Sequence, residues 1–246
     1  MEWSEEGIVI ATRRHGETDI ILEVVTAERG RHLGLVKGGR SRRFRPILQP
    51  GNTLALTWRA RLHEHLGNFR VEPVTERSVG LMRSSVASFG LALAAAHLRL
   101  LPERDPHPRL FHAFAAMLDC FDRPALAAEL MVRFELLLLD ELGFGLDLES
   151  CAATGARDDL VYVSPKSGRA VSRAAGTAYS DRFFVLPGFL AGKAGEAADP
   201  AGVEQAFRMT GFFLERHAQD TRGQALPIER DSFIRALRSF SVSAAL

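Results

Sequence analysis

Cysteine is scarce in this 246-residue sequence, which holds only Cys120 and Cys151. Two cysteines cannot form a disulfide framework, so the chain is expected to work in a reducing compartment. Long apolar runs are also missing, because the richest one, Leu136–Leu139, is followed at once by two acidic residues and falls short of the ~18 residues of a membrane span. The first six residues are acidic and lack the basic and apolar segments of a signal peptide. These features predict a cytoplasmic protein.

Signatures of catalysis are absent as well. The segment Gly188–Lys193 resembles a nucleotide-phosphate loop, but it is one residue short and Ala194 replaces the hydroxyl residue that would hold magnesium. No Gly-x-Ser-x-Gly elbow is present. Two groups of alternating His, Glu and Asp residues would point to one face of a strand and could bind a metal ion there. The favoured interpretation is that these side chains are simply solvent-exposed, because no third ligand is fixed in place. The two groups are His15, Glu17 and Asp19, and His63 and His65. We expect no enzyme activity and no cofactor.

Positive charge is concentrated in one window, although the whole chain is almost neutral with 31 Lys+Arg and 30 Asp+Glu. Between Arg29 and Arg61 there is no acidic residue, and arginine greatly outnumbers lysine. At its centre the stretch Lys37–Arg45 begins with a glycine pair, which permits positive φ and a close approach of backbone N–H groups. Guanidinium groups match phosphate geometry, and a cluster of them attracts a polyanion. The window therefore predicts nucleic-acid contact, with a solvated basic hairpin tip as the alternative.

Two aromatic residues lie inside this window and could stack on bases. Trp58 alternates with Leu54 and Leu56, which favours a place in a barrel core. Phe44 stands among arginines, and burial and base stacking remain equally open for it. The candidate nucleic-acid-binding residues are Arg31, Lys37, Arg40, Arg42, Arg43, Phe44, Arg45, Arg59 and Arg61.

The first 75 residues follow a period of two, which predicts a small β-barrel. Turn signals such as Gly38-Gly39 and Pro50-Gly51 separate five short apolar runs. Five strands in this length are typical of an OB-fold, and an SH3-like barrel stays open. The expected strands lie around residues 8–10, 20–25, 33–36, 54–58 and 62–71.

Beyond Glu76 the apolar period changes to that of helices. Five helices are expected, over about 76–101, 109–121, 125–142, 203–218 and 228–239. The third is expected to be capped by Asp122 and to end at Gly143. Between the third and fourth helices, Leu160–Val163 and residues 169–172 predict a β-hairpin. The predicted fold is α+β, with an OB-fold domain over 1–78, a helical domain over 79–246 and an inserted hairpin region over 146–192.

Two groups of segments resemble the RecO recombination mediators. The first comprises Gly7–Val9, His15–Ile21, Thr26–Gly30 and Val36–Arg40, which are similar to that family's N-terminal barrel. The second is Arg133–Cys151, which is similar to the family's central helix and the turn into its zinc-binding part. The segments follow each other in the family's order.

The resemblance implies a protein that binds single- and double-stranded DNA and anneals complementary strands. It also implies help in loading recombinase onto DNA coated by single-strand-binding protein. The implied partners are RecR and the acidic C-terminal tail of single-strand-binding protein. Arg133 and Leu137 match positions suited to hold that tail's carboxylates and its aromatic end, while a helix-surface ion pair of Arg133 with Glu129 is the alternative. DNA binding implies association with the nucleoid.

The sequence departs from the family where many members have a four-cysteine zinc site. Cys151 is followed by Thr154 where a second cysteine would stand, and Ser172 and Ala175 occupy what corresponds to the second pair. One thiol cannot hold tetrahedral zinc, so we expect a metal-free zinc-ribbon-like remnant.

The sequence therefore predicts a DNA-binding recombination mediator. A second hypothesis is a protein–protein adaptor without direct DNA contact, in which the acidic helical part does the work. A third is a metal-dependent nuclease that uses His63, His65 and nearby carboxylates.

Overall fold

The computed structural model of the chain describes residues 1–192, 198–222 and 226–244, with the backbone alone described for 218–222 and 241–244. Contacts between residues divide the chain into two compact units. Unit 1 holds Met1–Asp122 and Glu229–Ala236, and unit 2 holds Arg123–Ile228 and the chain from Leu237 onward. The predicted domain boundaries at residue 78 and at 146–192 stay predictions. Among the described helices, none combines the length and apolarity that a membrane crossing requires.

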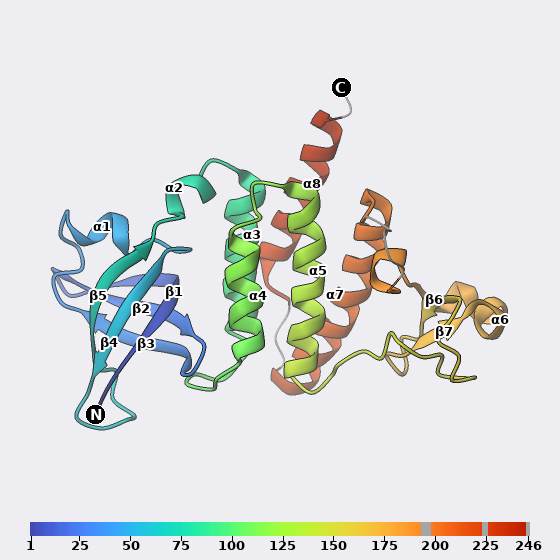
Figure 1. Cartoon of the computed structure of the whole chain (residues 1–246), viewed down its shortest axis with the longest axis horizontal. Helices are drawn as coiled ribbons and strands as arrows, with labels where there is room; N and C mark the ends of the chain where they lie inside the picture. The colour runs from blue at the N-terminus through green and yellow to red at the C-terminus, as the bar shows by residue number, and fades with distance from the viewer. Residues whose placement is uncertain (193–197, 223–225, 245–246) are drawn as a thin grey trace. The chain divides into compact units, whose positions relative to one another are not determined.

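Unit 1 begins with the predicted five-stranded barrel. The strands close in the order β1-β2-β3-β5-β4, with β3 and β5 parallel and all other pairs antiparallel. A closed ring of five strands followed by helices confirms the predicted OB-like α+β fold. A four-residue helix, α1, joins β3 to β4 (Figure 1). The strands are β1 (Glu2–His15), β2 (Asp19–Thr26), β3 (Gly30–Val36), β4 (Thr53–Arg59) and β5 (Asn68–Thr75), and α1 is Phe44–Ile47.

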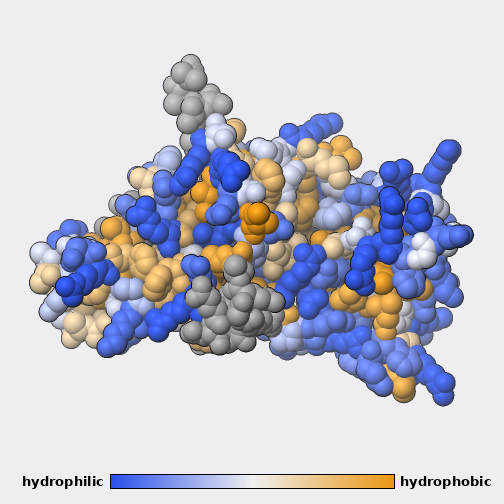
Figure 2. All heavy atoms as spheres, turned by 180° about the vertical axis from the view of Figure 1, so that it is seen from behind, coloured by the Kyte–Doolittle hydropathy of each residue, from blue (hydrophilic) through white to orange (hydrophobic). Residues whose placement is uncertain are grey.

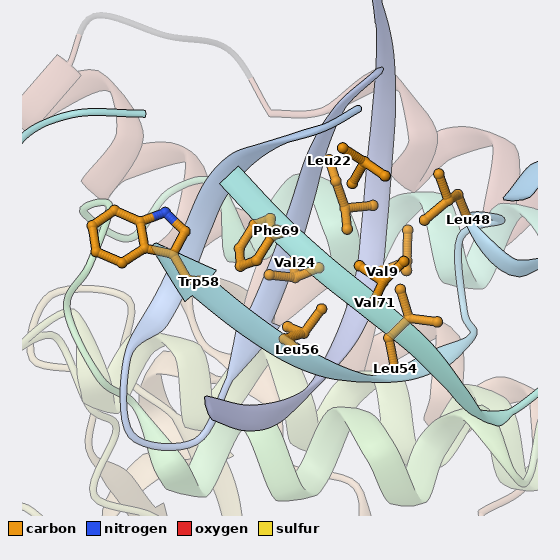
Figure 3. Packing of buried hydrophobic residues seen from close by; sticks show 10 residues of the cluster. Val9, Leu22, Val24, Leu48, Leu54, Leu56, Trp58, Phe69 and Val71 are labelled. Carbon is orange, nitrogen blue, oxygen red and sulfur yellow. The ribbon is translucent and has the colours of Figure 1, made fainter. Parts of the chain in front are cut away.

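Alternate residues of these strands fill the barrel, as the period of two predicts. Trp58 is fully buried, so its predicted place in the core is confirmed. Leu48, which follows α1, and Trp58 lie at opposite ends of this core (Figure 3). The remaining members of the cluster are Val9, Leu22, Val24, Val36, Leu54, Leu56, Phe69 and Val71.

The predicted fifth strand over 62–71 is wrong at its start, because β5 begins only at Asn68. Residues 60–67 form a connecting loop, which Gly67 ends with φ of 65°. The loop is held from inside the barrel, since the indole N–H of Trp58 donates to the carbonyl of Leu66 at 3.0 Å. His63 and His65 therefore lie on a loop and share no strand face.

The first predicted helix is interrupted. A single turn, α2 (Ser78–Leu81), precedes α3 (Ser85–Leu98), because Ser84 is extended and its hydroxyl accepts the N–H of Ala87 as an N-cap. Val79, Met82 and Phe89, which the sequence places inward, are exposed, while Val86 and Leu93 are buried. The other helices of unit 1 are α4 (Pro108–Leu118) and the Glu229–Ala236 part of α8 (Ile228–Ala244).

Unit 2 is built around α5 (Pro124–Glu141), which packs against α7 (Pro200–Arg222). The expected Asp122 cap is wrong, because Arg123 precedes the helix and no side chain caps it. The expected end is confirmed. Gly143 has φ of 86°, its N–H donates to the carbonyl of Asp140, and the N–H of Phe144 donates to the carbonyl of Leu139. This pattern is a Schellman motif.

The predicted hairpin of unit 2 is present as β6 (Leu160–Val163) and β7 (Ala170–Ser172). A two-residue strand, β8 (Phe184–Val185), pairs with the other edge of β6. This small sheet packs on Met209 and Phe213 of α7, and both C-terminal helices run further than predicted. Short helices complete the region: α6 (Arg173–Gly176), η1 (Thr177–Arg182) and η2 (Gly188–Leu190).

Candidate nucleic-acid interface

The basic stretch Lys37–Arg45, here called the basic loop, is the exposed turn after β3 together with the first two residues of α1. Gly38 has φ of 64°, and Gly39 donates its N–H to the carbonyl of Val36 at 3.2 Å. The chain therefore turns sharply at the end of β3, as the glycine pair predicts. Ser41 then bonds back to the carbonyl of Gly38 at 3.0 Å, so the loop is a compact turn.

The tip of the β1–β2 hairpin holds this loop in place. The carboxylate of Asp19 accepts the N–H of Gly38 at 2.9 Å, and this hydrogen bond, followed by one from Thr18, lowers the pKa of Asp19. Arg40 donates its N–H to the carbonyl of Thr18 at 3.0 Å, and its guanidinium donates to the carbonyl of Glu17. The predicted alternating set His15, Glu17 and Asp19 is thus a hairpin turn that positions the basic loop.

The cations of the loop are open to solvent. Among the described residues no acidic side chain forms an ion pair with any of them. The turn contributes two acidic residues nearby, but Asp19 already serves the backbone of Gly38. A strong excess of positive charge therefore remains at this end of the barrel, which suits contact with a phosphate backbone. The exposed cations are Lys37, Arg40, Arg42, Arg43 and Arg45.

Phe44 is half-buried and packs against the barrel core as the first residue of α1. The guanidinium carbon of Arg43 lies 5.5 Å from the centre of its ring. Phe44 therefore fixes α1 on the barrel and also supports one of the exposed arginines. Its base-stacking role stays a prediction.

Arg59 and Arg61 lie elsewhere on the barrel. Arg59 ends β4 and pairs with Glu2 at 2.7 Å, and Arg61 is in the loop that follows. Neither arginine belongs to the basic loop: Arg59 lies opposite Asn68 of β5, which pairs with Leu35 of β3, while the labels of the N-terminus and α1 stand apart in Figure 1. Glu2 compensates the charge of Arg59 directly, which makes that arginine a weaker attractor for a polyanion.

Arg31 is engaged inside unit 1. Its guanidinium lies 3.1 Å from the carboxylate of Glu23, which also pairs with Arg99, the residue that follows α3, at 2.9 Å. Only 17% of the Arg31 side chain is exposed. The structure thus gathers five of the predicted cations in one loop and separates Arg31, Arg59 and Arg61 from them.

The sets considered for metal binding do not assemble. Over the described ranges, no group of three or more His, Cys, Asp and Glu side chains could hold a metal ion. His63 and His65 belong to the 60–67 loop, where their carbonyls accept the guanidinium of Arg104. Lys193 and Ala194, which decide the failed phosphate-loop motif, lie outside the described residues.

Cys151 keeps an environment built around its sulfur. Burial raises the pKa of this thiol, but hydrogen bonds with the Ser172 and Thr154 hydroxyls and from the N–H groups of Ser172 and Ala153 outweigh burial and lower the pKa to about 6. The N–H of Ser172 lies 3.2 Å from the sulfur. Thr154 and Ser172, at the positions expected for absent cysteines, are thus hydrogen-bonded to the remaining one.

In unit 2, the guanidinium of Arg133 forms the ion pair that the sequence left open. It lies 2.8 Å from the carboxylate of Glu129, one helical turn away on α5. It also donates to the carbonyl of Phe189 at 2.8 Å and lies over that residue's ring. Leu137, one turn further along α5, is partly exposed.

Sequence reasoning overlooked Arg13 and Arg14, which precede the basic window and lie next to the end of β1 at His15. Both are exposed, in the hairpin whose tip holds the basic loop. The available signal was Gly16 between two apolar runs, which is typical of a turn, because an antiparallel hairpin brings residues before the turn beside those after it. In the view from behind, hydrophilic side chains cover much of the barrel surface at the right of the picture (Figure 2).

Comparison with known proteins agrees with this architecture. Residues 1–77 match the family Recombination protein O N terminal, and residues 81–224 match Recombination protein O C terminal. "DNA repair protein RecO" of Mesorhizobium japonicum is 58% identical over 97% of this chain and 94% of its own length. The protein of the same name from Brucella abortus is 51% identical over the full length of both chains. With a five-stranded barrel, an exposed basic loop and full-length relatives of this kind, the chain belongs to the RecO family.

Proposed function

We propose that this chain is a non-enzymatic recombination mediator that binds DNA, anneals complementary strands and helps to load recombinase onto DNA coated by single-strand-binding protein. Membership of the RecO family, whose relatives are DNA repair proteins, supports this function. The observation on which the DNA site depends is the loop Lys37–Arg45, with five exposed cations and no acidic partner among the described side chains. Such an activity belongs with the nucleoid in the cytoplasm.

The proposed mechanism is electrostatic. Two DNA strands repel each other through their phosphates, and this repulsion opposes the approach that base pairing requires. Arginines that bind phosphate oxygens in pairs of hydrogen bonds neutralise part of that charge and release condensed counterions. The loop holds its cations on a backbone fixed by Asp19 and Thr18, so little ordering is needed when DNA binds.

The candidate residues differ in the strength of their support. Lys37, Arg40, Arg42, Arg43 and Arg45 share one exposed loop, and Phe44 supports that loop from the barrel. Arg59 is exposed but paired with Glu2, Arg61 lies outside this loop, after β4, and Arg31 is occupied by Glu23. We therefore expect the loop to dominate the affinity for DNA and the other three arginines to add little.

The proposed protein partners are RecR and the acidic C-terminal tail of single-strand-binding protein. For the tail we propose Arg133 as the carboxylate contact and Leu137 as part of the apolar contact. Both residues lie on α5 one turn apart, which suits a short peptide with an acidic and an aromatic part. Arg133 would then exchange Glu129 for a carboxylate of the tail.

Salt titration of DNA binding tests the proposed site. Replacing Arg40, Arg42 and Arg43 with Ala should weaken binding of a labelled oligothymidine and lower the slope of log K against log salt by about 2, at ~0.7 for each phosphate that is no longer neutralised. The control is a triple Ala variant of Arg157, Arg173 and Arg182, which removes the same charge from exposed positions of unit 2. An unchanged slope in the loop variant, or an equal decrease in the control, contradicts the proposed site.

Two further measurements separate the alternatives. A pure adaptor retains no labelled oligonucleotide in a filter-binding assay, whereas the proposed mediator does. The nuclease hypothesis predicts cleavage of the oligonucleotide on addition of a divalent metal, and the proposed function predicts that it stays intact. Annealing of complementary oligonucleotides, with and without single-strand-binding protein, then measures the mediator activity directly.

A further inference from the structure

Strand β1 extends beyond the barrel wall. It pairs with β4 only through Glu2–Ile8 and with β2 through Gly7–His15, with an irregularity between Val9 and Ala11. The last residues of β1 therefore have β2 on one side and no β4 on the other. Because β3 pairs with the other side of β2, the three strands together project past β4 toward the basic loop, which is bonded to the tip of the β1–β2 hairpin.

The two arginines near the end of β1 lie on opposite faces of this hairpin. Residues directly opposite each other in an antiparallel pair share a face, and neighbours along a strand alternate. Arg14 pairs with Ile20, which packs against the barrel core. Arg13 pairs with Ile21, on the face where Glu23 binds Arg99, the residue that follows α3.

The face of Arg14 leads to the basic loop. Ile20 lies opposite Val36, the last residue of β3. A Cβ placed on Gly39 would lie 3.0 Å from the Cβ of Ile20, so the loop backbone passes directly over that side chain. Arg14 therefore stands on the same side of the hairpin as the loop, next to the residue that the loop covers.

We propose that Arg14 is a further DNA-phosphate contact of the site formed by the loop Lys37–Arg45, and that its neighbour Arg13 is not. Both guanidiniums are exposed, and neither has an ion-pair partner among the described side chains. The two arginines differ only in the face of the strand to which they belong: Arg14 shares the face of Ile20 and Arg13 that of Ile21. The inference rests on the proposed function, since it adds a residue of the β1–β2 hairpin to the DNA site that the loop forms.

The pair Arg13→Ala and Arg14→Ala is a matched test, because both changes remove one exposed arginine from adjacent positions of one strand. Affinity for a labelled oligothymidine is measured by fluorescence anisotropy from 0.1 to 0.5 M salt. At these concentrations the Debye length is about 10 Å or less, so an exposed charge acts only on phosphates close to it. Arg14→Ala should lower the salt slope by ~0.7 and weaken binding about fourfold at 0.15 M, the effect of one phosphate left without its arginine. Arg13→Ala should leave the slope unchanged.

The loop variant of Arg40, Arg42 and Arg43 is measured in parallel, so that two kinds of failure can be distinguished. If the loop variant binds more weakly while Arg14→Ala behaves like Arg13→Ala, the inference about Arg14 is wrong and the proposed function stands. If the loop variant also keeps its slope, the proposed DNA site itself is wrong. Equal decreases in Arg13→Ala and Arg14→Ala overturn the assignment to one face. The midpoint of urea unfolding checks that all variants are folded.

Discussion

The side-chain carbonyl of Asn52 accepts the backbone N–H of Arg77 at 2.8 Å and that of Ser78 at 3.0 Å. The same amide donates both of its hydrogens, at 3.0 Å each, to the carbonyls of Pro46 and Ile47 in α1. Asn52 is fully buried, so one side chain joins the helix that follows the basic loop to the segment where the barrel ends.

Replacing Asn52 with Ala should therefore destabilise unit 1. The change leaves two buried N–H groups and two carbonyls without their partner, at about 1–3 kcal/mol for each group that stays unsatisfied. We expect a decrease of about 3 kcal/mol in the free energy of unfolding. Urea titration can follow it by tryptophan fluorescence, since both tryptophans lie in the barrel. The exposed Asn68 offers the control, and a decrease as small as that of Asn68→Ala would contradict the role of Asn52.

Two glycines with the same backbone conformation provide a second prediction. Gly30 and Gly16 have φ of 62° and 56°. A Cβ on Gly30 would lie 1.9 Å from the carbonyl oxygen of Asp105, whereas nothing lies within 4 Å of one on Gly16. Alanine at either position bears the left-handed penalty of about 1–2 kcal/mol.

Gly30→Ala must in addition displace the backbone that packs along β3, where Arg104 bonds to the carbonyl of Arg31 at 2.8 Å. Displacement of this kind costs about 1–3 kcal/mol in a packed site. The difference in unfolding free energy between Gly30→Ala and Gly16→Ala should thus be about 2 kcal/mol. Equal values for the two variants would show that the segment of Asp105 moves away freely.

The strands of the barrel could be predicted because period and turn residues are local signals, as with the run that ends at Val36 before the glycine pair. The 60–67 loop could not, because Leu62 and Leu66 continue the alternation of apolar residues beyond β4. What ends the sheet there is tertiary: the bond from Trp58 to Leu66 and the two bonds from Arg104, which is 39 residues away from His65.

In the candidate site, too, local features could be predicted from the sequence and tertiary contacts could not. Exposure of the loop cations follows from local composition, since no acidic residue lies within Lys37–Arg45. The engagement of Arg31 depends on Glu23, which is shared with Arg99 at a distance of 76 residues along the chain. Only the barrel topology brings these charges together, and no spacing in the sequence indicates it.

His32 gives the barrel a predicted dependence on pH. Burial lowers the pKa of this imidazole from 6.5 to about 4, against the hydrogen bond to the carbonyl of Leu33, which raises it. Between these values the unfolded chain binds a proton that the folded barrel does not. Stability from the neutral His32 is therefore complete above pH 6.5 and is lost as the pH falls toward 4, by roughly 3 kcal/mol in total.

The rings of Trp3 and Trp58 lie 5.2 and 5.0 Å from that of His32, so their fluorescence reports on its surroundings. Urea unfolding from pH 7 to pH 4 should show a steep decrease in the stability of the wild type. In His32→Phe, which keeps an aromatic ring there, the decrease over this range should be smaller. Parallel pH profiles of the two proteins would exclude His32 as the cause.

Competition at Arg133 provides the last prediction. Its guanidinium is bound to Glu129 at 2.8 Å, and an acidic peptide has to displace that carboxylate. Glu129→Gln should therefore strengthen binding of a peptide with the acidic, aromatic character of the single-strand-binding protein tail. An exposed pair of this kind is worth about 0.3–0.5 kcal/mol, which corresponds to roughly a twofold change in Kd.

Arg133→Ala should weaken binding of the same peptide by roughly ten- to hundredfold, because a charge-assisted hydrogen bond contributes about 1.5–3 kcal/mol. Isothermal titration calorimetry measures both changes, and Arg208→Ala, which removes an exposed arginine of α7, is the control. Opposite shifts for Glu129→Gln and Arg133→Ala, with none for Arg208→Ala, identify Arg133 as the contact. Weaker binding in Glu129→Gln would instead mean that the ion pair holds the arginine in the orientation the peptide needs, and the competition would be wrong.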